Sequence, residues 1–319
     1  MSPFKQLKKQ ATGSPAVRWV EKQSKKILLP GFHGLPLYDV VLFFFKQLRK
    51  VGLSERTSAI SFNFIMAIPP MIIFLATLIP YLPISKEFIN QLHALIQDVI
   101  PGKQNNAAII RFIDDFLNKP RYDLLSLGFI LAMFFSSNAM MGIMNAFDKN
   151  YLGFRKRTGL EKRGIALQLT LILFLLMFAS LFLLMLQGSM LRWMGIRDVP
   201  TQMIIKYGRW VIIALLFLVS ISLIYRHAPF IHKKWRLINP GSVLATTLML
   251  VFINLFSWWL NNYSTYNKIY GPISTVLILM SLIYVNSLVL LIGFELNVSI
   301  SSLKHEVDER NKLTSGSSK

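Results

Sequence analysis

The residues of this sequence that could do chemistry are few, and none forms a recognised catalytic pattern. The five histidines lack a zinc-binding spacing, and neither a glycine-rich phosphate loop nor a nucleophile elbow is present. No cysteine occurs, which excludes thiol catalysis and cysteine-bound metals. The adjacent carboxylates Asp114 and Asp115 are more simply a solvated helix face than the acidic metal site that a ribonuclease needs. The sequence therefore predicts no enzyme, no catalytic or metal-binding residue and no cofactor.

Glu295 is the ionisable residue that comes closest to the middle of a long apolar run. Charge inside a membrane is costly, so the uncharged centres of the apolar runs argue against a buried-carboxylate proton relay. Arg56 and Arg226 lie, like Glu295, at ends of apolar runs that are expected to meet at one membrane face. We expect Glu295 to pair with Arg226 or Arg56 and to lock these helix ends together. The alternative is a role for Glu295 in the movement of a substrate or an ion.

A second group of candidates consists of polar and helix-breaking residues within or between the apolar runs. Its members are Asn63, Pro69, Asn138, Asn145, Tyr266, Asn267, Tyr270 and Gly271. Amide side chains inside a membrane often form hydrogen bonds between helices, and they can equally line a polar pathway or cavity. Tyr266 and Tyr270 share one helix face, which suits an aromatic anchor at the interface or a gate at the mouth of a cavity. The sequence leaves both alternatives open.

The elements that must position these residues are long apolar helices, and the clearest pair lies between Leu237 and Ser299. No charged residue occurs from Leu237 to Asn267 or from Ile269 to Phe294, on either side of Lys268. Each run exceeds the roughly 20 residues with which a helix crosses a bilayer, and a helix satisfies its own backbone in lipid. Gly271-Pro272 ends one helix and can begin the next, so we predict a transmembrane hairpin.

Short motifs in and around this hairpin carry a resemblance to a known family. They are Tyr266-Asn267-x-x-Tyr270-Gly271, Gly293-Phe294-Glu295-Leu296-Asn297, Tyr225-Arg226-x-x-Pro229, Pro240-Gly241 and the stretch from Ala59 to Pro70. Together they resemble the YihY/BrkB family of bacterial inner-membrane proteins, once mislabelled as ribonuclease BN. The resemblance covers about residues 38–302 and implies the architecture and an inner-membrane location, without a secure biochemical activity. It also implies a structural role for the motif residues Tyr225, Pro229, Pro240, Gly241, Gly293 and Asn297.

Composition independently predicts an all-α polytopic membrane protein. The 319 residues are 53% hydrophobic and 16% charged, with a mean hydropathy of +0.48. Six transmembrane helices are expected at about residues 58–82, 124–147, 165–191, 207–225, 240–266 and 272–297. The net charge of +20 would suggest a nucleic-acid partner for a soluble protein. Here the basic residues flank apolar spans, so orientation and lipid headgroups explain them better, and we expect no nucleic-acid partner.

Three regions follow one another along the chain. Residues 1–57 are a basic cytoplasmic segment that ends in an interfacial amphipathic helix. Residues 58–302 form the six-span membrane domain, with an outer amphipathic segment at 84–121 and a first span that Pro69 and Pro70 bend. Residues 303–319 are polar and predict a disordered cytoplasmic tail.

The distribution of basic residues predicts the orientation of the protein. Six spans put both termini on one side, and that side carries most of the 35 lysine and arginine residues. The positive-inside rule therefore places both termini in the cytoplasm.

Two functions remain as hypotheses. One is a transporter or a lipid- or amphiphile-handling protein of the inner membrane, whose partners are membrane lipids and a small-molecule or lipid substrate. The other is a structural or scaffolding membrane protein without transport. An oligomer is compatible with both.

Overall fold

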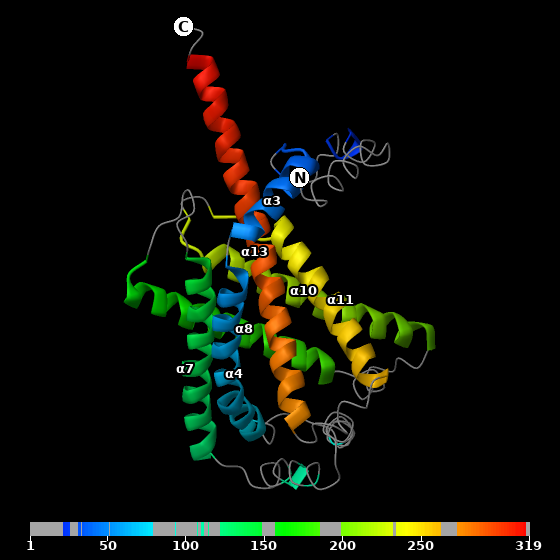
Figure 1. The fold of residues 1–319 in the computed structure, drawn as a ribbon. Coiled ribbons are helices and arrows are strands. Elements are labelled where there is room, and N and C mark those ends of the chain that lie inside the picture. Colours follow the sequence, from blue (N-terminus) through cyan, green and yellow to red (C-terminus); the bar gives the residue numbers. More distant parts are fainter. Residues whose placement is uncertain are drawn as a thin grey trace, which may run out of the picture.

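The helices of this protein form an elongated bundle, in which the helix Leu37–Lys50 lies at the same end as the C-terminal part of the last helix, Ile273–Gly316 (Figure 1). A computed structural model of the chain describes residues 22–25, 31–32, 34–50, 52–78, 93, 107, 110–111, 114, 122–148, 157–185, 199–231, 234–262 and 273–316. Its long helices are α3 (Leu37–Lys50), α4 (Leu53–Leu78), α7 (Tyr122–Phe147), α8 (Gly159–Met185), α10 (Val199–His227), α11 (Pro240–Asn262) and α13 (Ile273–Gly316). We call the end of the bundle at which α3 lies and from which α13 projects the terminal end.

The prediction of an all-α polytopic membrane protein is confirmed. Among the described residues, α4, α7, α8, α11 and α13 each contain a stretch that is long and apolar enough to cross a membrane. In α10 the apolar stretch Val211–His227 is shorter, although the whole helix begins at Val199. Five of the six predicted spans thus meet the length and composition of a spanning helix. Helix α10 covers the remaining predicted span, at residues 207–225.

Several element boundaries differ from those expected from the sequence. Helix α4 begins at Leu53, and α8 begins at Gly159, so both take in charged residues that hydropathy alone assigns to the flanks. Pro69 and Pro70 lie within α4, which continues through them to Leu78. The predicted outer amphipathic segment at 84–121 lies outside the described residues, except for His93, Ala107, Ile110, Arg111 and Asp114.

The prediction of disorder after Ser302 is wrong for residues 303–316. Helix α13 continues without interruption to Gly316 and projects from the terminal end (Figure 1). Leu303 packs against buried side chains of the bundle. One turn farther along, His305 Nδ1 lies 3.6 Å from Glu309 Oε1. A helix that is already formed adds one hydrogen bond for each further residue, so a polar sequence of good helix formers prolongs it easily.

Six helices pack in a closed order. Each of α4, α7, α8, α10, α11 and α13 contacts the next, and α13 contacts α4 again. One buried cluster joins all six, with members that include Ile60, Phe147, Leu169, Tyr225, Met249 and Leu291. These residues lie in the half of the bundle near the terminal end. A smaller cluster around Phe74, Ala132 and Phe174 joins α4, α7 and α8 farther from that end.

Candidate functional site

Five consecutive residues of α13, from Gly293 to Asn297, contact four other helices, α3, α4, α7 and α11. Gly293 meets α11, and Phe294 meets α7. Glu295 binds α4, Leu296 packs with α3 and its leading segment, and Asn297 binds the start of α11. A helix turn of 3.6 residues sends successive side chains in different directions, so one turn can contact several neighbouring helices. We call these five residues and their partners Arg56, Tyr225, Asn239 and Gly241 the joint.

The charged part of the joint is a buried ion pair between α4 and α13. Arg56 Nη1 donates a hydrogen bond to Glu295 Oε1 at 2.6 Å, and the two side chains are 8% and 0% exposed. A pair in this position is strongly coupled, because either charge alone would be left without its counter-charge in a low-dielectric environment. Of the two partners expected for Glu295, the structure brings it to Arg56. Arg226 is half-buried, and its Nε has no hydrogen-bond partner among the described residues.

The second part of the joint is the close approach of α11 and α13 at two glycines. A Cβ atom on Gly293 would lie 2.5 Å from the backbone oxygen of Gly241 and 2.5 Å from the Tyr225 hydroxyl. A Cβ atom on Gly241 would in turn overlap the backbone oxygen of Gly293. Only glycine allows two helix backbones to approach this closely. Tyr225 is fully buried at this point, and its hydroxyl donates to the backbone oxygen of Leu290 at 2.6 Å.

The start of α11 is capped from two directions. Asn239 is the N-cap residue, since its Oδ1 accepts a hydrogen bond from the backbone N–H of Ser242 at 2.9 Å. Pro240 follows at the first helical position, where its missing N–H has no cost. Asn297 Oδ1 accepts a hydrogen bond from the backbone N–H of Gly241 at 2.9 Å, and Asn297 Nδ2 donates one to Asn239 Oδ1 at 2.6 Å. A side chain of α13 thereby satisfies an N–H that the first turn of α11 leaves free.

Aromatic side chains fill the space beside these polar contacts. The rings of Phe294 and Phe147 stack with their centroids 3.8 Å apart and their planes at 1°. The ring of Trp235 also contacts Phe294, with the centroids 5.6 Å apart, and its Nε1 donates to Ser301 Oγ at 3.0 Å. The joint is therefore apolar around its hydrogen bonds, which makes each of them costly to break.

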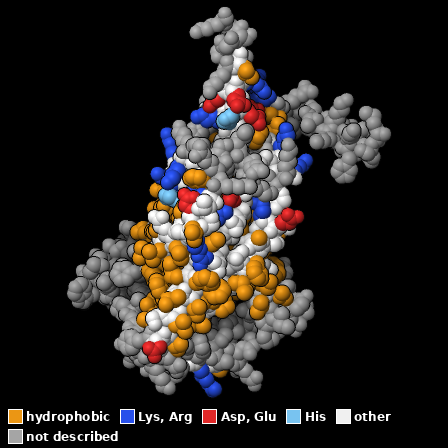
Figure 2. All heavy atoms as spheres, turned by 90° about the vertical axis from the view of Figure 1, so that its left-hand side faces the viewer, with side chains coloured by type: hydrophobic (Ala, Val, Ile, Leu, Met, Phe, Trp, Pro, Cys, Tyr) orange, Lys and Arg blue, Asp and Glu red, His pale blue; other side chains and the backbone are white. Residues whose placement is uncertain are grey.

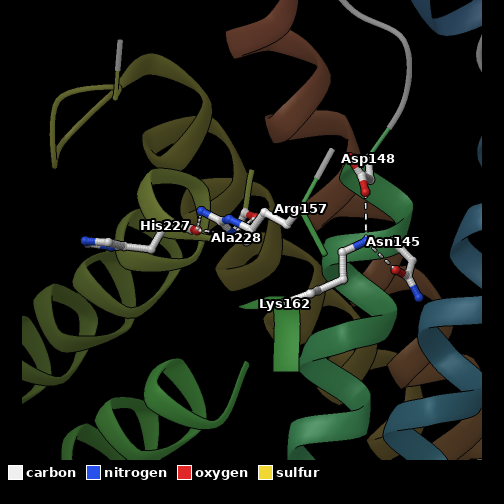
Figure 3. A network of polar contacts seen from close by, with 6 residues as sticks. All are labelled: Asn145, Asp148, Arg157, Lys162, His227 and Ala228. Carbon is white, nitrogen blue, oxygen red and sulfur yellow. Dashed lines mark hydrogen bonds and ion pairs between the residues drawn. The ribbon is translucent and has the colours of Figure 1, made fainter. Parts of the chain in front are cut away.

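A separate polar network lies where α7, α8 and α10 reach the terminal end (Figure 3). Arg157 donates to the backbone oxygens of His227 and Ala228 at 3.0 to 3.2 Å, and so binds the carbonyls at the end of α10. Burial lowers the pKa of the Arg157 guanidinium, and the nearby carboxylates of Glu161 and Asp148 raise it. Arginine remains charged despite this, so it complements the negative end of the helix dipole.

The other cation of this network joins α7 to α8. Lys162 Nζ lies 2.7 Å from Asp148 Oδ2 and 2.9 Å from Asn145 Oδ1. The hollow between Lys162, Arg157 and Pro229 has a volume of about 10 Å³, which is room for roughly one water molecule. This network therefore joins Asp148 and Arg157, which flank α7 and α8, to Lys162 and the end of α10, and its hollow is too small for a substrate.

The polar candidates of the sequence lie in several places. Asn138 and Asn145 of α7 accept hydrogen bonds from Arg163 and Lys162 of α8. Asn63 donates to the backbone oxygen of Ala59 in its own helix, with Gly142 of α7 packed beside it. Pro69 lies on the exposed side of α4. The structure thus does not bring these four residues into one cavity. The remaining candidates, Tyr266, Asn267, Tyr270 and Gly271, lie outside the described residues.

The motif residues behave differently, because the joint gathers most of them from three helices. Tyr225, Gly241, Gly293 and Asn297 come together, with Pro240 at the first turn of α11. Pro229 is buried just after α10 and lines the hollow beside Arg157. The sequence profile of the family described as virulence factor BrkB matches residues 44–316 of this chain.

The chain belongs to the BrkB family. The match runs from the middle of α3 to the end of α13, and so includes every helix of the BrkB joint. A ribonuclease-like protein of Bacillus subtilis, YfkH, is 25% identical over 259 residues, which cover 80% of this chain and 92% of that protein. The resemblance to the BrkB family expected from the motifs is confirmed.

Shorter matches link this BrkB chain to other membrane proteins. A UPF0761 membrane protein of Xanthomonas campestris is 36% identical over 88 residues, which cover 28% of this chain and 21% of that protein. A UPF0761 membrane protein of Tolumonas auensis is 34% identical over 86 residues, covering 27% of this chain and 28% of that protein. No solved structure matches the chain.

Sequence reasoning missed several residues that hold the BrkB joint and the network beside it. Asn239 directly before Pro240 is a helix-start signal and could have been found from the sequence. Arg157, Lys162 and Trp235 carry no such signal, because their partners are far away in the chain. No group of three or more residues suited to a metal occurs among the described residues.

Proposed function

We propose that this protein is a transporter or a lipid- or amphiphile-handling protein of the bacterial inner membrane, with both termini in the cytoplasm. The observation that carries the proposal is an asymmetric ring of helices. Six helices close on one another, and the core that all of them share is confined to the half near the terminal end. A ring whose shared core lies at one end suits a pathway that is closed on that side.

The helices that lack a core in the other half are α10, α11 and α13. No described side chain is buried from Val211 to Ser220, from Leu250 to Trp259 or from Val276 to Asn286. Helices α11 and α13 cross at the joint and diverge away from it (Figure 1). The same helices are tightly packed a few turns later, so the loss of burial follows from their divergence.

Three polar side chains in this half are satisfied within their own helices. Asn254 and Asn286 each donate to the backbone oxygen four residues earlier, at 2.7 and 2.8 Å, and Ser281 does the same at 2.8 Å. Asn254 and Ser281 are exposed. Groups that need no partner from another helix can face a solute or the headgroup of an amphiphile without loss of a structural contact.

The charge distribution supports the proposed orientation. Figure 2 shows hydrophobic side chains over the middle and lower part of one face, with charged side chains mostly toward the end that carries the C-terminus. The basic residues Arg157, Lys162 and Arg163 lie near this terminal end. Under the positive-inside rule a basic end faces the cytoplasm. The joint would then be the cytoplasmic closure of the pathway.

The natural absence of cysteine makes this proposal directly testable. Single cysteines are introduced at Asn254, Ser281 and Asn286, and inverted and right-side-out vesicles are treated with a membrane-impermeant maleimide. We expect Ser281→Cys and Asn286→Cys to react from the periplasmic side only. Ser222→Cys, at a buried position near the joint, is the matched control and should react from neither side. Protection of all positions from both sides would refute the pathway.

A flux assay tests movement itself. Proteoliposomes with the full chain and a fluorescent phospholipid or amphiphile in one leaflet are compared with protein-free vesicles. Faster translocation in the proteoliposomes supports the proposal. The proposal is contradicted if the rates in proteoliposomes and in protein-free vesicles are equal, both for lipids and for water-soluble anionic and cationic solutes. The proposal contains no catalytic step and no nucleic-acid partner, so purified protein should not cleave RNA, in contrast to what the name of YfkH suggests for that protein.

The tight joint favours a second candidate, a structural membrane protein without transport. Five successive residues of α13 fasten the other elements, and the hollow beside Arg157 holds only about one water molecule. Under this alternative the introduced cysteines stay unreactive, flux equals the background, and partner proteins remain bound after mild extraction.

A further inference from the structure

Helix α3 presents two apolar faces, and only one of them is covered. Val40 and Phe44 are buried against Leu296 and Ile300 of α13, together with Phe32. This contact places α3 across the terminal end of the bundle, beside the joint (Figure 1). The covered face therefore touches the turn of α13 that carries Glu295 and Asn297.

The opposite face of α3 is exposed although it is apolar. Leu42 is 61% exposed and Phe45 is 58% exposed. Lys46 and Arg49 follow these two residues at a spacing of four and are also exposed. Residues four apart lie on the same side of a helix, so the apolar stripe and the two cations form one surface. We call it the α3 outer face.

Near this face lie one further cation, Lys25, and one carboxylate, Asp39. Lys25 places its Nζ 5.0 Å from the ring centre of Tyr38, at the start of α3. Asp39 is the one acidic residue in the sequence of α3. An exposed apolar stripe with cations at its edges matches the boundary between acyl chains and headgroups of an anionic membrane.

The position of α3 in the chain selects a bilayer as the occupant of this face. Helix α3 ends at Lys50, and the spanning helix α4 begins at Leu53. The start of a spanning helix lies at the membrane surface, so a helix separated from it by only two residues lies at the same level. A second copy of the chain would have to bring its own basic α3 outer face against this one, which places like charges together.

We propose that the α3 outer face binds anionic phospholipid headgroups and that this binding stabilises the joint through Val40 and Phe44. The same helix is anchored in the headgroup layer on one side and packed on Leu296 and Ile300 on the other. Loss of the lipid contact frees α3, and the turn of α13 beside Glu295 then loses its cover. The proposal does not depend on whether the protein transports a substrate.

Hydrogen exchange of the full chain in lipid nanodiscs tests the proposal. One set of discs contains phosphatidylcholine alone, and the other contains a mixture with phosphatidylglycerol. We expect slower exchange in the anionic discs for α3 and for residues 296–303. Replacement of Lys46 and Arg49 by glutamine should remove this difference, with about a fivefold loss of protection for each charge, and high salt should weaken it in the same way.

Matched variants separate lipid binding from general effects of charge. Lys234→Gln with Arg236→Gln removes two exposed cations elsewhere in the chain and should leave the exchange of α3 unchanged. Phe45→Ser should raise exchange of α3 in both kinds of disc, because it removes the apolar anchor. Equal exchange of the original chain in both lipids would overturn the proposal. Protection that disappears in discs with a single protein copy would also overturn it, because it would assign the face to a second copy.

Discussion

Replacement of Glu295 by glutamine is the most informative perturbation of this protein. The substitution keeps the size of the side chain and removes its charge, so Arg56 remains in a site where it is only 8% exposed. Its counter-charge is then gone. Loss of one partner of a buried ion pair typically costs about 3–5 kcal/mol, because the other charge stays buried without compensation.

The geometry supports a value in this range. At a separation of 2.6 Å, two unit charges attract each other by about 6 kcal/mol if the effective dielectric constant is ~20. Transfer of each ion from water offsets several kcal/mol of this attraction, so the intact pair contributes little net stability. We therefore expect both single variants, Glu295→Gln and Arg56→Gln, to be strongly destabilised. The double variant should be more stable than the sum of the two losses implies.

A double-mutant cycle measures this coupling. Unfolding of the four proteins is followed by circular dichroism in mixed micelles with increasing dodecyl sulfate, and the free energies of unfolding are compared. Glu309→Gln on the exposed part of α13 is the matched control and should change the free energy by less than about 0.5 kcal/mol. Additive losses, or a loss below about 1 kcal/mol for Glu295→Gln, would refute the role assigned to this pair.

Three further substitutions test the rest of the structure. Gly293→Ala should destabilise the protein by more than about 3 kcal/mol, since its Cβ would lie 2.5 Å from the Tyr225 hydroxyl. The control is Gly164→Ala in α8, whose Cβ would meet nothing within 4 Å. This variant should be neutral or stabilising in the same unfolding assay. Asn297→Ala leaves the Gly241 N–H without its acceptor and should cost about 1–3 kcal/mol, with faster hydrogen exchange at the start of α11 as the readout. Arg157→Gln should lower the midpoint of unfolding and increase exchange at the end of α10, and Arg157→Lys should restore it only in part, because lysine cannot donate to both carbonyls from a planar fork. Equal behaviour of the lysine and glutamine variants would contradict the capping role.

Helices that are defined by local runs of apolar residues could be predicted from the sequence, whereas helix boundaries that such runs do not mark could not. Long uncharged runs were sufficient for α7 and α11, whose described starts differ from the predicted ones by no more than two residues. The charged first turns of α4 and α8 were assigned to the flanks, because hydropathy does not register a helix that begins before its apolar part. The extension of α13 was missed for a related reason, since its polar composition is common to disordered tails and to exposed helices.

The candidate site shows the same division between local and distant information. The sequence indicated that Glu295 would have an arginine partner, but Arg56 and Arg226 were equivalent choices until the helices were arranged in space. The amides Asn138 and Asn145 were identified as polar groups within a span, and only their position opposite α8 shows that they accept hydrogen bonds from Arg163 and Lys162.

By itself, the sequence determined the class of fold, the approximate positions of the spanning helices and the family. These properties depend on runs of apolar residues and on short motifs, which are local in the chain. The tertiary structure alone decided the closed order of the helices, the approach of Gly241 to Gly293 and the pairing of Arg56 with Glu295. These contacts join residues 52 and 239 positions apart, and no local pattern specifies which faces of two helices meet. Packing of the neighbouring helices against one turn of α13 supplies that information.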